Sequence, residues 1–253
     1  TLPQLRLAGT DHQNHETQRH AEGLSATGML LCRTVRGPDR GKGRGLTLEQ
    51  RPPGNTQRSV LQRTTMKARP NRFALQRAAR ILWEGGVVAY PTEAVYGLGC
   101  DPLNRAAVEG LLAIKQRPVE KGLILIASRF GQLSPFLEPQ PPELQQQLDA
   151  SWPGPVTWLV PANPATPHWL RGKHHSLAVR VTAHPLAAAL CEAFGGAIVS
   201  TSANPAGRPP ARSALQARLR CPGVDLIVQG STGRLARPTP IRDLISGKVL
   251  RSS

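Results

Sequence analysis

Three short polar runs carry the side chains that could do chemistry, and each lies at the end of an apolar segment. They are residues 90–99 (YPTEAVYGLG), 115–118 (KQRP) and 200–204 (STSAN). Their hydroxyls, cations and open backbone are the groups that bind the phosphates of a nucleotide. No Walker-type loop occurs in the sequence, so a nucleotide would be bound in another way.

Arg180 is a cation inside an apolar segment, residues 177–181 (LAVRV). A buried arginine must be paired or contact a ligand, because an isolated buried charge is too costly. An ion pair with Glu93 or Asp101 is one interpretation. A phosphate or carboxylate ligand is the other.

Lys115 and Arg117 lie two residues apart at the end of a predicted helix. Taken alone, they are explained by a favourable interaction with the helix dipole. The hydroxyls of residues 200–204 could likewise serve only a turn or a helix cap, although such hydroxyls also bind phosphate oxygens. Gly97 and Gly99 lack the third glycine of a dinucleotide-binding fingerprint, so that motif is excluded.

Alternating helices and strands must position these residues, which indicates an α/β fold with a parallel or mixed sheet. Ligands of such sheets bind beyond the carboxyl ends of strands. We therefore expect residues 91–92 and 200–202, each at such an end, to meet in one site. Apolar patterning predicts helices at 73–84, 104–117 (stopped by Pro118), 184–194 and 213–219, and strands at 87–90, 123–127, 156–160, 177–181, 197–199 and 224–228.

The first 65 residues differ from the rest in composition. They contain no aromatic residue, whereas all ten aromatic residues lie at or after Phe73. Such a segment cannot bury enough apolar surface to offset its ordering entropy. We predict a disordered basic extension over residues 1–68 and a folded domain over 69–253. A start site assigned too far upstream, with Met66 as the true first residue, is a hypothesis that would explain the extension.

The chain is strongly basic, with 32 Lys and Arg against 16 Asp and Glu and a formal charge of +16. Residues 1–65 carry 10 basic and 5 acidic side chains, so the other 22 and 11 leave the predicted domain at +11. A basic domain suggests a polyanionic partner: nucleic acid, nucleotide or an acidic membrane surface. A solvated arginine-rich surface is the alternative.

Cysteine spacing and hydropathy narrow the class of protein. The four cysteines show no metal-binding spacing, so no metal site is predicted, and reduced thiols in a cytoplasmic protein are the simplest interpretation. No apolar run reaches the ~18 residues of a membrane span. The N-terminal residues lack the apolar core of a signal peptide.

Residues from about 73 to 251 resemble the short bacterial threonylcarbamoyl-AMP synthases of the YrdC-like family. Any one shared run is weak evidence, but five in the family's order are strong. The resemblance implies a single YrdC-like domain: a twisted, mixed parallel and antiparallel open sheet flanked by helices, with a basic concave surface. The five runs are residues 91–99 (PTEAVYGLG), 115–118 (KQRP), 152–157 (WPGPVT), 177–181 (LAVRV) and 200–204 (STSAN).

The resemblance also implies an activity. Such enzymes make L-threonylcarbamoyl-adenylate and pyrophosphate from L-threonine, bicarbonate and ATP, and magnesium accompanies the ATP. A threonylcarbamoyl transferase complex then modifies adenosine 37 of tRNAs that read codons starting with A. The implied enzyme is cytoplasmic, and direct tRNA binding is an open expectation.

The resemblance assigns site residues by position. Thr92 and Arg180 correspond to threonine-binding positions, and Lys115, Arg117 and Arg180 supply catalytic cations. Longer family members have a histidine where this chain has Ile126, which leaves threonine selection unexplained. The implied ATP-binding residues are Lys115, Arg117, Ser176, Ser200, Ser202, Asn204, Thr239 and Arg251.

Two other functions compete with the synthase. A non-catalytic RNA-binding module would explain the basic charge, but RNA-binding cations usually sit on exposed faces and Arg180 does not. A carbamoyl-transfer protein of hydrogenase maturation would carry zinc-finger and acylphosphatase segments, which this sequence lacks.

Overall fold

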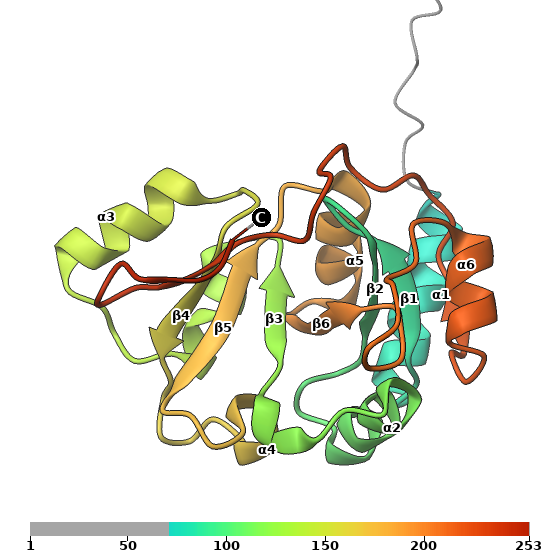
Figure 1. Cartoon of the computed structure of the whole chain (residues 1–253), viewed down its shortest axis with the longest axis horizontal. Coiled ribbons are helices and arrows are strands. Elements are labelled where there is room, and N and C mark those ends of the chain that lie inside the picture. Colours follow the sequence, from blue (N-terminus) through green and yellow to red (C-terminus); the bar gives the residue numbers. More distant parts are fainter. Residues whose placement is uncertain (1–70, 253) are drawn as a thin grey trace, which may run out of the picture. The chain divides into compact units, whose positions relative to one another are not determined.

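The computed structural model describes residues 71–252 (Figure 1). The predicted extension over residues 1–68, with Met66, lies outside the described residues. In the described part of the chain, no helix is long and apolar enough to cross a membrane.

A mixed sheet forms the centre of the described domain, with strand order β7-β1-β2-β6-β3-β5-β4-β8-β9. The pairs β1–β7, β3–β5 and β4–β8 are parallel and the other neighbours are antiparallel, which confirms the predicted mixed α/β sheet. The strands are β1 Val88–Pro91, β2 Tyr96–Gly99, β3 Ile124–Ala127, β4 Thr157–Pro161, β5 Ser176–Val181, β6 Ile198–Ser202, β7 Leu226–Ile227, β8 Ile241–Asp243 and β9 Val249–Arg251.

Helices cover the sheet and bury its apolar side chains in two clusters. Helices α1 and α5 pack against each other and bury Leu75, Tyr90, Ile126 and Leu190 with β1 and β3. The larger cluster includes side chains of α2 and α6 and of strands β2, β4 and β5. The helices are α1 Arg72–Trp83, α2 Arg105–Lys115, α3 Pro142–Ser151, α4 His168–Arg171, α5 Pro185–Phe194 and α6 Ala214–Arg220, with short 3₁₀ turns η1 Val119–Lys121, η2 Phe130–Gln132 and η3 Ser134–Phe136.

The ends of helix α2 position the second polar run. Asn104 caps its start as predicted, because its side chain accepts a hydrogen bond from Ala107 N at 3.1 Å. The helix ends at Lys115, before the predicted stop at Pro118. Gln116 there adopts φ 50°, a left-handed conformation that ends a helix by itself.

The sequence prediction was wrong about two segments of the site. Residues 90–99 are not one open polar run, because Tyr96–Gly99 forms β2 between β1 and β6. Ser200 and Ser202 lie within β6 rather than beyond its end. Glycines hide β2 from propensity arguments, since they have no side chain to pack. The hydroxyls therefore stand on the sheet itself.

Gly99 is one position where the fold requires the absence of a side chain. A Cβ added there would lie 2.6 Å from the carbonyl oxygen of Val199 and 2.8 Å from Cε1 of Tyr90. Both neighbours belong to the packed sheet and cannot move cheaply.

We expect Gly99→Ala to lower the free energy of unfolding by about 1–3 kcal/mol, as overpacking does in cores. Urea denaturation measures this change. Gly110→Ala is the matched control: a Cβ there meets nothing within 4 Å, and alanine favours the helix. Equal unfolding midpoints for wild type and Gly99→Ala would contradict the close approach.

Candidate active site

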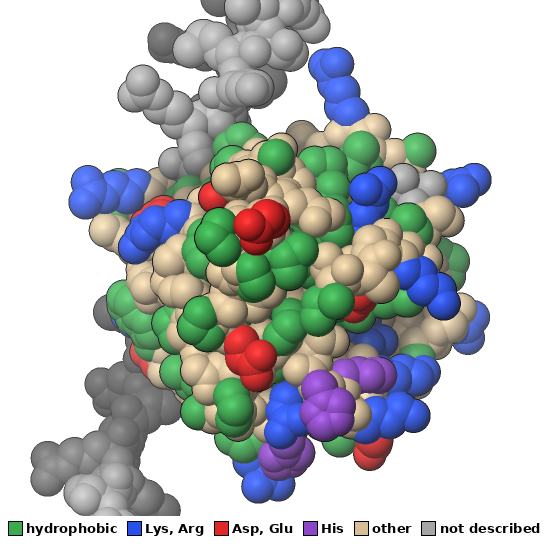
Figure 2. Space-filling view, turned by 90° about the vertical axis from the view of Figure 1, so that its left-hand side faces the viewer, with side chains coloured by type: hydrophobic (Ala, Val, Ile, Leu, Met, Phe, Trp, Pro, Cys, Tyr) green, Lys and Arg blue, Asp and Glu red, His purple; other side chains and the backbone are tan. Residues whose placement is uncertain are grey.

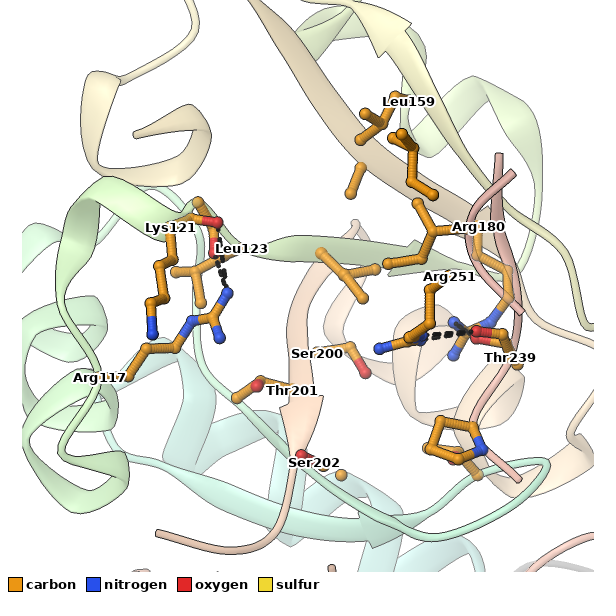
Figure 3. Close-up of a pocket in the computed structure, with 18 of the residues that line it drawn as sticks. Arg117, Lys121, Leu123, Leu159, Arg180, Ser200, Thr201, Ser202, Thr239 and Arg251 are labelled. Atoms are coloured by element: carbon orange, nitrogen blue, oxygen red, sulfur yellow. Dashed lines mark hydrogen bonds between the residues drawn. The ribbon is translucent and has the colours of Figure 1, made fainter. Parts of the chain in front are cut away.

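A pocket of about 510 Å³ opens over β6, β5 and the segment that enters β3. Its lining carries five Lys and Arg side chains, and no Asp or Glu of the described residues lines it. Ser200, Thr201 and Ser202 lie between two groups of cations (Figure 3). The pocket brings together nine predicted site residues: Thr92, Arg117, Ser176, Arg180, Ser200, Ser202, Asn204, Thr239 and Arg251.

Arg180 anchors one side of the pocket and is only 4% exposed. Its Nη1 donates to Thr157 Oγ1 at 3.0 Å and to Thr239 Oγ1 at 3.1 Å. Its Nη2 lies 3.4 Å from Glu93 Oε2. Glu93 is thus the acidic partner that the sequence left open, and Asp101 instead accepts from a nearby backbone N–H. Arg180 is both ion-paired and part of the pocket lining.

Glu93 lies behind Arg180, buried and outside the pocket lining. Thr182 Oγ1 donates to its Oε1 at 2.5 Å. Burial acts to raise the pKa of Glu93, but the charge of Arg180 and the hydrogen bond from Thr182 outweigh it and hold the pKa below its usual value. Glu93 is therefore ionised at neutral pH.

Arg117 stands with Lys121 on the side of the pocket opposite Arg180 (Figure 3). Its Nη2 donates to the carbonyls of Gly122 at 3.0 Å and Lys121 at 3.3 Å. These bonds fix the guanidinium, while burial lowers its pKa. The pocket thus has a fixed cation on each side of the β6 hydroxyls.

Lys115 is the predicted site residue that the structure leaves outside the pocket lining. Its ammonium donates to the carbonyl of Ser202 and, at 2.8 Å, to that of Asn204. Ala206 N donates back to the carbonyl of Lys115 at 2.8 Å. Burial lowers the pKa of Lys115 to about 8. Lys115 acts on the pocket through the backbone that carries Ser202 and Asn204.

Asn204 offers the pocket a hydrogen-bond acceptor. Both hydrogens of its amide have local acceptors, the carbonyls of Pro205 at 2.9 Å and Arg208 at 2.6 Å. Its buried Oδ1 has no hydrogen-bond partner among the described residues. Asn204 can therefore accept a hydrogen bond, for instance from a hydroxyl, more readily than it can donate one.

Thr92 lies in a tight turn between β1 and β2. Its hydroxyl donates to Val95 O at 2.8 Å, and its carbonyl accepts from Gly233 N at 2.9 Å. Gly97 lets this turn approach β6, because a Cβ there would lie 3.3 Å from Thr92 Cγ2 and 3.5 Å from Ser200 Oγ. The first and third polar runs meet at this glycine.

The C-terminal strand closes the Arg180 side of the pocket. Arg251 donates from Nε at 3.1 Å and from Nη2 at 2.6 Å to the carbonyl of Thr239. The hydroxyl of Thr239 in turn accepts from Arg180. Burial lowers the pKa of Arg251, and the charges of Arg180 and Arg117 add to this effect. Thr239 and Arg251 both line the pocket.

Ile126 does not take the place of a ligand-binding side chain. It is fully buried in the cluster under α1 and α5 and does not line the pocket. At this part of the chain the pocket is lined by Leu123 and Ile124. This segment gives the pocket an apolar wall.

Sequence reasoning missed three polar residues of the lining: Lys121, Arg171 and His174. Arg171 and His174 belong to the run 168–175 (HWLRGKHH), whose basic character was the available signal. That residues of this run line the pocket follows from the tertiary fold, and no local sequence pattern predicts it. On the face drawn in Figure 2, Lys, Arg and His side chains gather toward the lower edge.

The fold is α/β, and the pocket suits an anionic ligand, because cations and hydroxyls surround it and no carboxylate of residues 71–252 lines it. The family model of Sua5, YciO and YrdC, described as "Telomere recombination", matches residues 80–253. The chain belongs to this family.

Curated relatives match over nearly their whole length. A threonylcarbamoyl-AMP synthase of Alkalilimnicola ehrlichii is 61% identical over 185 residues, covering 72% of this chain and 96% of the relative. One from Halorhodospira halophila is 58% identical over 181 residues, covering 71% and 94%.

Solved structures share the fold. Sua5 of P. abyssi, complexed with L-threonine, has a TM-score of 0.66 at 32% identity and covers 70% of this chain and 53% of that one. E. coli YciO has a TM-score of 0.64 at 28% identity, covering 72% and 90%. A full-length HypF shares the fold alone, at 18% identity and a TM-score of 0.62.

Proposed function

We propose that this chain is an L-threonylcarbamoyladenylate synthase. It condenses L-threonine, bicarbonate and ATP to threonylcarbamoyl-adenylate and pyrophosphate. The product supplies the N6-threonylcarbamoyl group at adenosine 37 of tRNAs that read codons starting with A. The observation that carries the proposal is the 61% identity to a threonylcarbamoyl-AMP synthase over 96% of that enzyme.

The pocket suits this chemistry. The amine of threonine and bicarbonate form an N-carboxylate with loss of one water. An oxygen of this carboxylate then attacks the α-phosphorus of ATP while the bond to pyrophosphate breaks. Negative charge gathers at the reacting atoms, so cations fixed before the reaction lower the barrier. Arg117 and Arg180 are fixed in this way by backbone and side-chain partners. The absence of carboxylates from the described lining avoids repulsion.

We assign the residues as follows. Thr92 and Arg180 bind threonine, and Arg180 with Arg117 stabilises the transition state. Ser176, Ser200, Ser202, Asn204, Thr239 and Arg251 join Arg117 in binding ATP. Lys115 supports this set from outside the lining, through the carbonyls of Ser202 and Asn204. Holding the labile N-carboxylate in place and away from water would supply much of the rate.

Magnesium enters this proposal with ATP, held by the phosphates. The side chains that line the pocket do not fit a protein-held magnesium ion, since they include no carboxylate. Among residues 71–252, no group of three or more His, Cys, Asp or Glu could hold a metal ion. No role of a protein residue depends on the ion.

The pathway partners follow from the product. Threonylcarbamoyl-adenylate hydrolyses readily, so a transferase complex that acts on tRNA must take it up quickly, and we place both in the cytoplasm. Direct tRNA contact would use the basic surface. The curated relatives favour the synthase over a purely RNA-binding module.

We expect purified protein to release pyrophosphate from ATP only when both threonine and bicarbonate are present. A coupled phosphate assay follows the release, and mass spectrometry identifies the adenylate. Omitting threonine is the control for ATP hydrolysis. Pyrophosphate release at the same rate with and without threonine would contradict the proposed function.

A further inference from the structure

Glu93 is a buried carboxylate that the proposed reaction does not use directly. It does not line the pocket, yet its closest charged partner is Arg180, with Oε2 3.4 Å from Nη2. Of the ion pairs in the described residues, this one alone is buried, at 5% and 9% side-chain exposure. Such a pair is weak evidence for stability, because desolvation offsets its attraction.

The surroundings of Arg180 use only part of its donor capacity. Nη1 is bound to Thr157 and Thr239 hydroxyls, whereas Nε has no hydrogen-bond partner among the described residues. Glu93 Oε2 likewise accepts no hydrogen bond within that part of the chain. The two hydroxyls and the carboxylate hold the guanidinium at one edge of the pocket, which it lines.

Glu93 is itself held in place by three contacts. Thr182 donates to its Oε1 at 2.5 Å. Leu235 N donates to its backbone carbonyl at 3.2 Å, and Gly233 packs so closely that an added Cβ would lie 2.4 Å from that carbonyl oxygen. The carboxylate therefore cannot follow Arg180 if the arginine turns, and it defines the direction of the guanidinium.

We propose that Glu93 is the positioning residue for Arg180 and thereby sets the affinity for the carboxylate of the amino-acid substrate. This inference rests on the proposed function, in which Arg180 binds that carboxylate. The negative charge of Glu93 alone would lower the affinity for the amino-acid substrate, because it repels the substrate carboxylate. In this proposal orientation outweighs the repulsion, because Arg180 lines the pocket whereas Glu93 does not, which would put the guanidinium nearer to the substrate carboxylate.

Glu93→Gln separates these effects because the side chain keeps its shape and loses its charge. A glutamine has one side-chain oxygen, so it cannot place an oxygen both beside Thr182 and beside Arg180, as the two oxygens of Glu93 do. Its NH₂ group would face a donor in one of the two contacts. The variant therefore loosens Arg180 without opening a cavity.

We expect Glu93→Gln to raise the KM for threonine about tenfold, as loss of one charged hydrogen bond would. The KM for ATP should change less than threefold. Initial rates of threonine-dependent pyrophosphate release give these values. Glu93→Asp, which keeps the charge, should recover part of the threonine affinity. Glu192→Gln is the matched control, because that exposed carboxylate pairs with Arg129 at 2.8 Å.

Three outcomes would overturn the inference: an unchanged KM for threonine, a lower one, or equal loss of affinity for both substrates. If Glu93→Gln fails to fold by circular dichroism, Thr182→Val provides the test. It removes the hydroxyl that orients Glu93 and should raise the KM for threonine in the same direction. Wild-type protein without threonine-dependent release would instead refute the proposed function, so the two failures are distinguishable.

Discussion

Replacing Arg180 by Met together with Glu93 by Gln is expected to lower kcat/KM for threonine at least 100-fold, about 2.7 kcal/mol of transition-state stabilisation. Arg180 is held at its side of the pocket by the hydroxyls of two protein residues, Thr157 and Thr239, and by the carboxylate of Glu93. Charged hydrogen bonds of a bidentate arginine contribute about 1.5–3 kcal/mol each. Loss of this single side chain therefore accounts for the expected effect.

The double change is needed because Arg180→Ala alone would leave Glu93 as an unpaired buried charge. Breaking a buried pair in that way costs about 3–5 kcal/mol of stability and could unfold the protein. Met and Gln keep the volume and remove both charges together. A folded double variant then reports on catalysis rather than on stability.

The matched control uses a pair of the same composition away from the pocket. Arg129 and Glu192 form an exposed ion pair at 2.8 Å, and neither lines the pocket. Arg129→Met with Glu192→Gln should keep wild-type kcat/KM for threonine. If both double variants lose activity equally, or if the pocket variant keeps it, Arg180 has no special role in the site.

Much of the fold could be predicted from local patterns. The apolar runs of β3 and β5 are nearly continuous because both strands lie inside the sheet. Such strands can be recognised in a sequence from the uninterrupted apolar run. Asn104 precedes an apolar helical pattern and caps it. These elements depend on few distant contacts, so sequence patterns suffice for them.

The parts that could not be predicted depend on tertiary contacts. β2 contains Gly97 and Gly99, which weaken any strand pattern, yet both are required where Thr92, Tyr90 and β6 approach closely. Lys121 and Arg171 reach the pocket from separate turns. No spacing rule connects such residues.

Arg180 shows how much of the site could be predicted from residue types alone. The apolar run around it required a partner or a ligand, and the structure provides a partner and a place in the pocket lining. Lys115 shows the opposite case. The family resemblance assigned it to ATP binding and catalysis, whereas the structure directs its ammonium to two carbonyl oxygens. Only the local backbone path distinguishes the two roles.

Lys115→Met is expected to lower kcat/KM for ATP by at least tenfold. The ammonium ties the end of α2 to the carbonyls of Ser202 and Asn204, both of which line the pocket. Methionine keeps the stem and removes the donors, so two acceptors lose charged hydrogen bonds, about 1.5–3 kcal/mol each. The backbone from residue 202 to residue 204 should shift, and steady-state rates with varied ATP measure the consequence.

The lowered pKa of Lys115 provides a second, independent test of its role, through the pH dependence of stability. Burial lowers it to about 8 from an ordinary value near 10.4, so the folded state disfavours the protonated form. This cost to stability is fully present below pH 8 and is relieved as pH rises toward the unfolded value. Wild type should therefore gain stability over that range, and Lys115→Met should not, as urea titrations at several pH values would measure.

Activity should show the opposite trend, because the charge that strengthens the two hydrogen bonds is lost above pH 8. We expect kcat/KM for ATP to decline there in wild type. In Lys115→Arg the decline should move to higher pH, since a guanidinium stays charged. Lys121→Arg is the control for a general effect of arginine near the pocket. A wild-type decline that persists unchanged in Lys115→Arg would assign the titration to another group and leave Lys115 as a purely structural anchor.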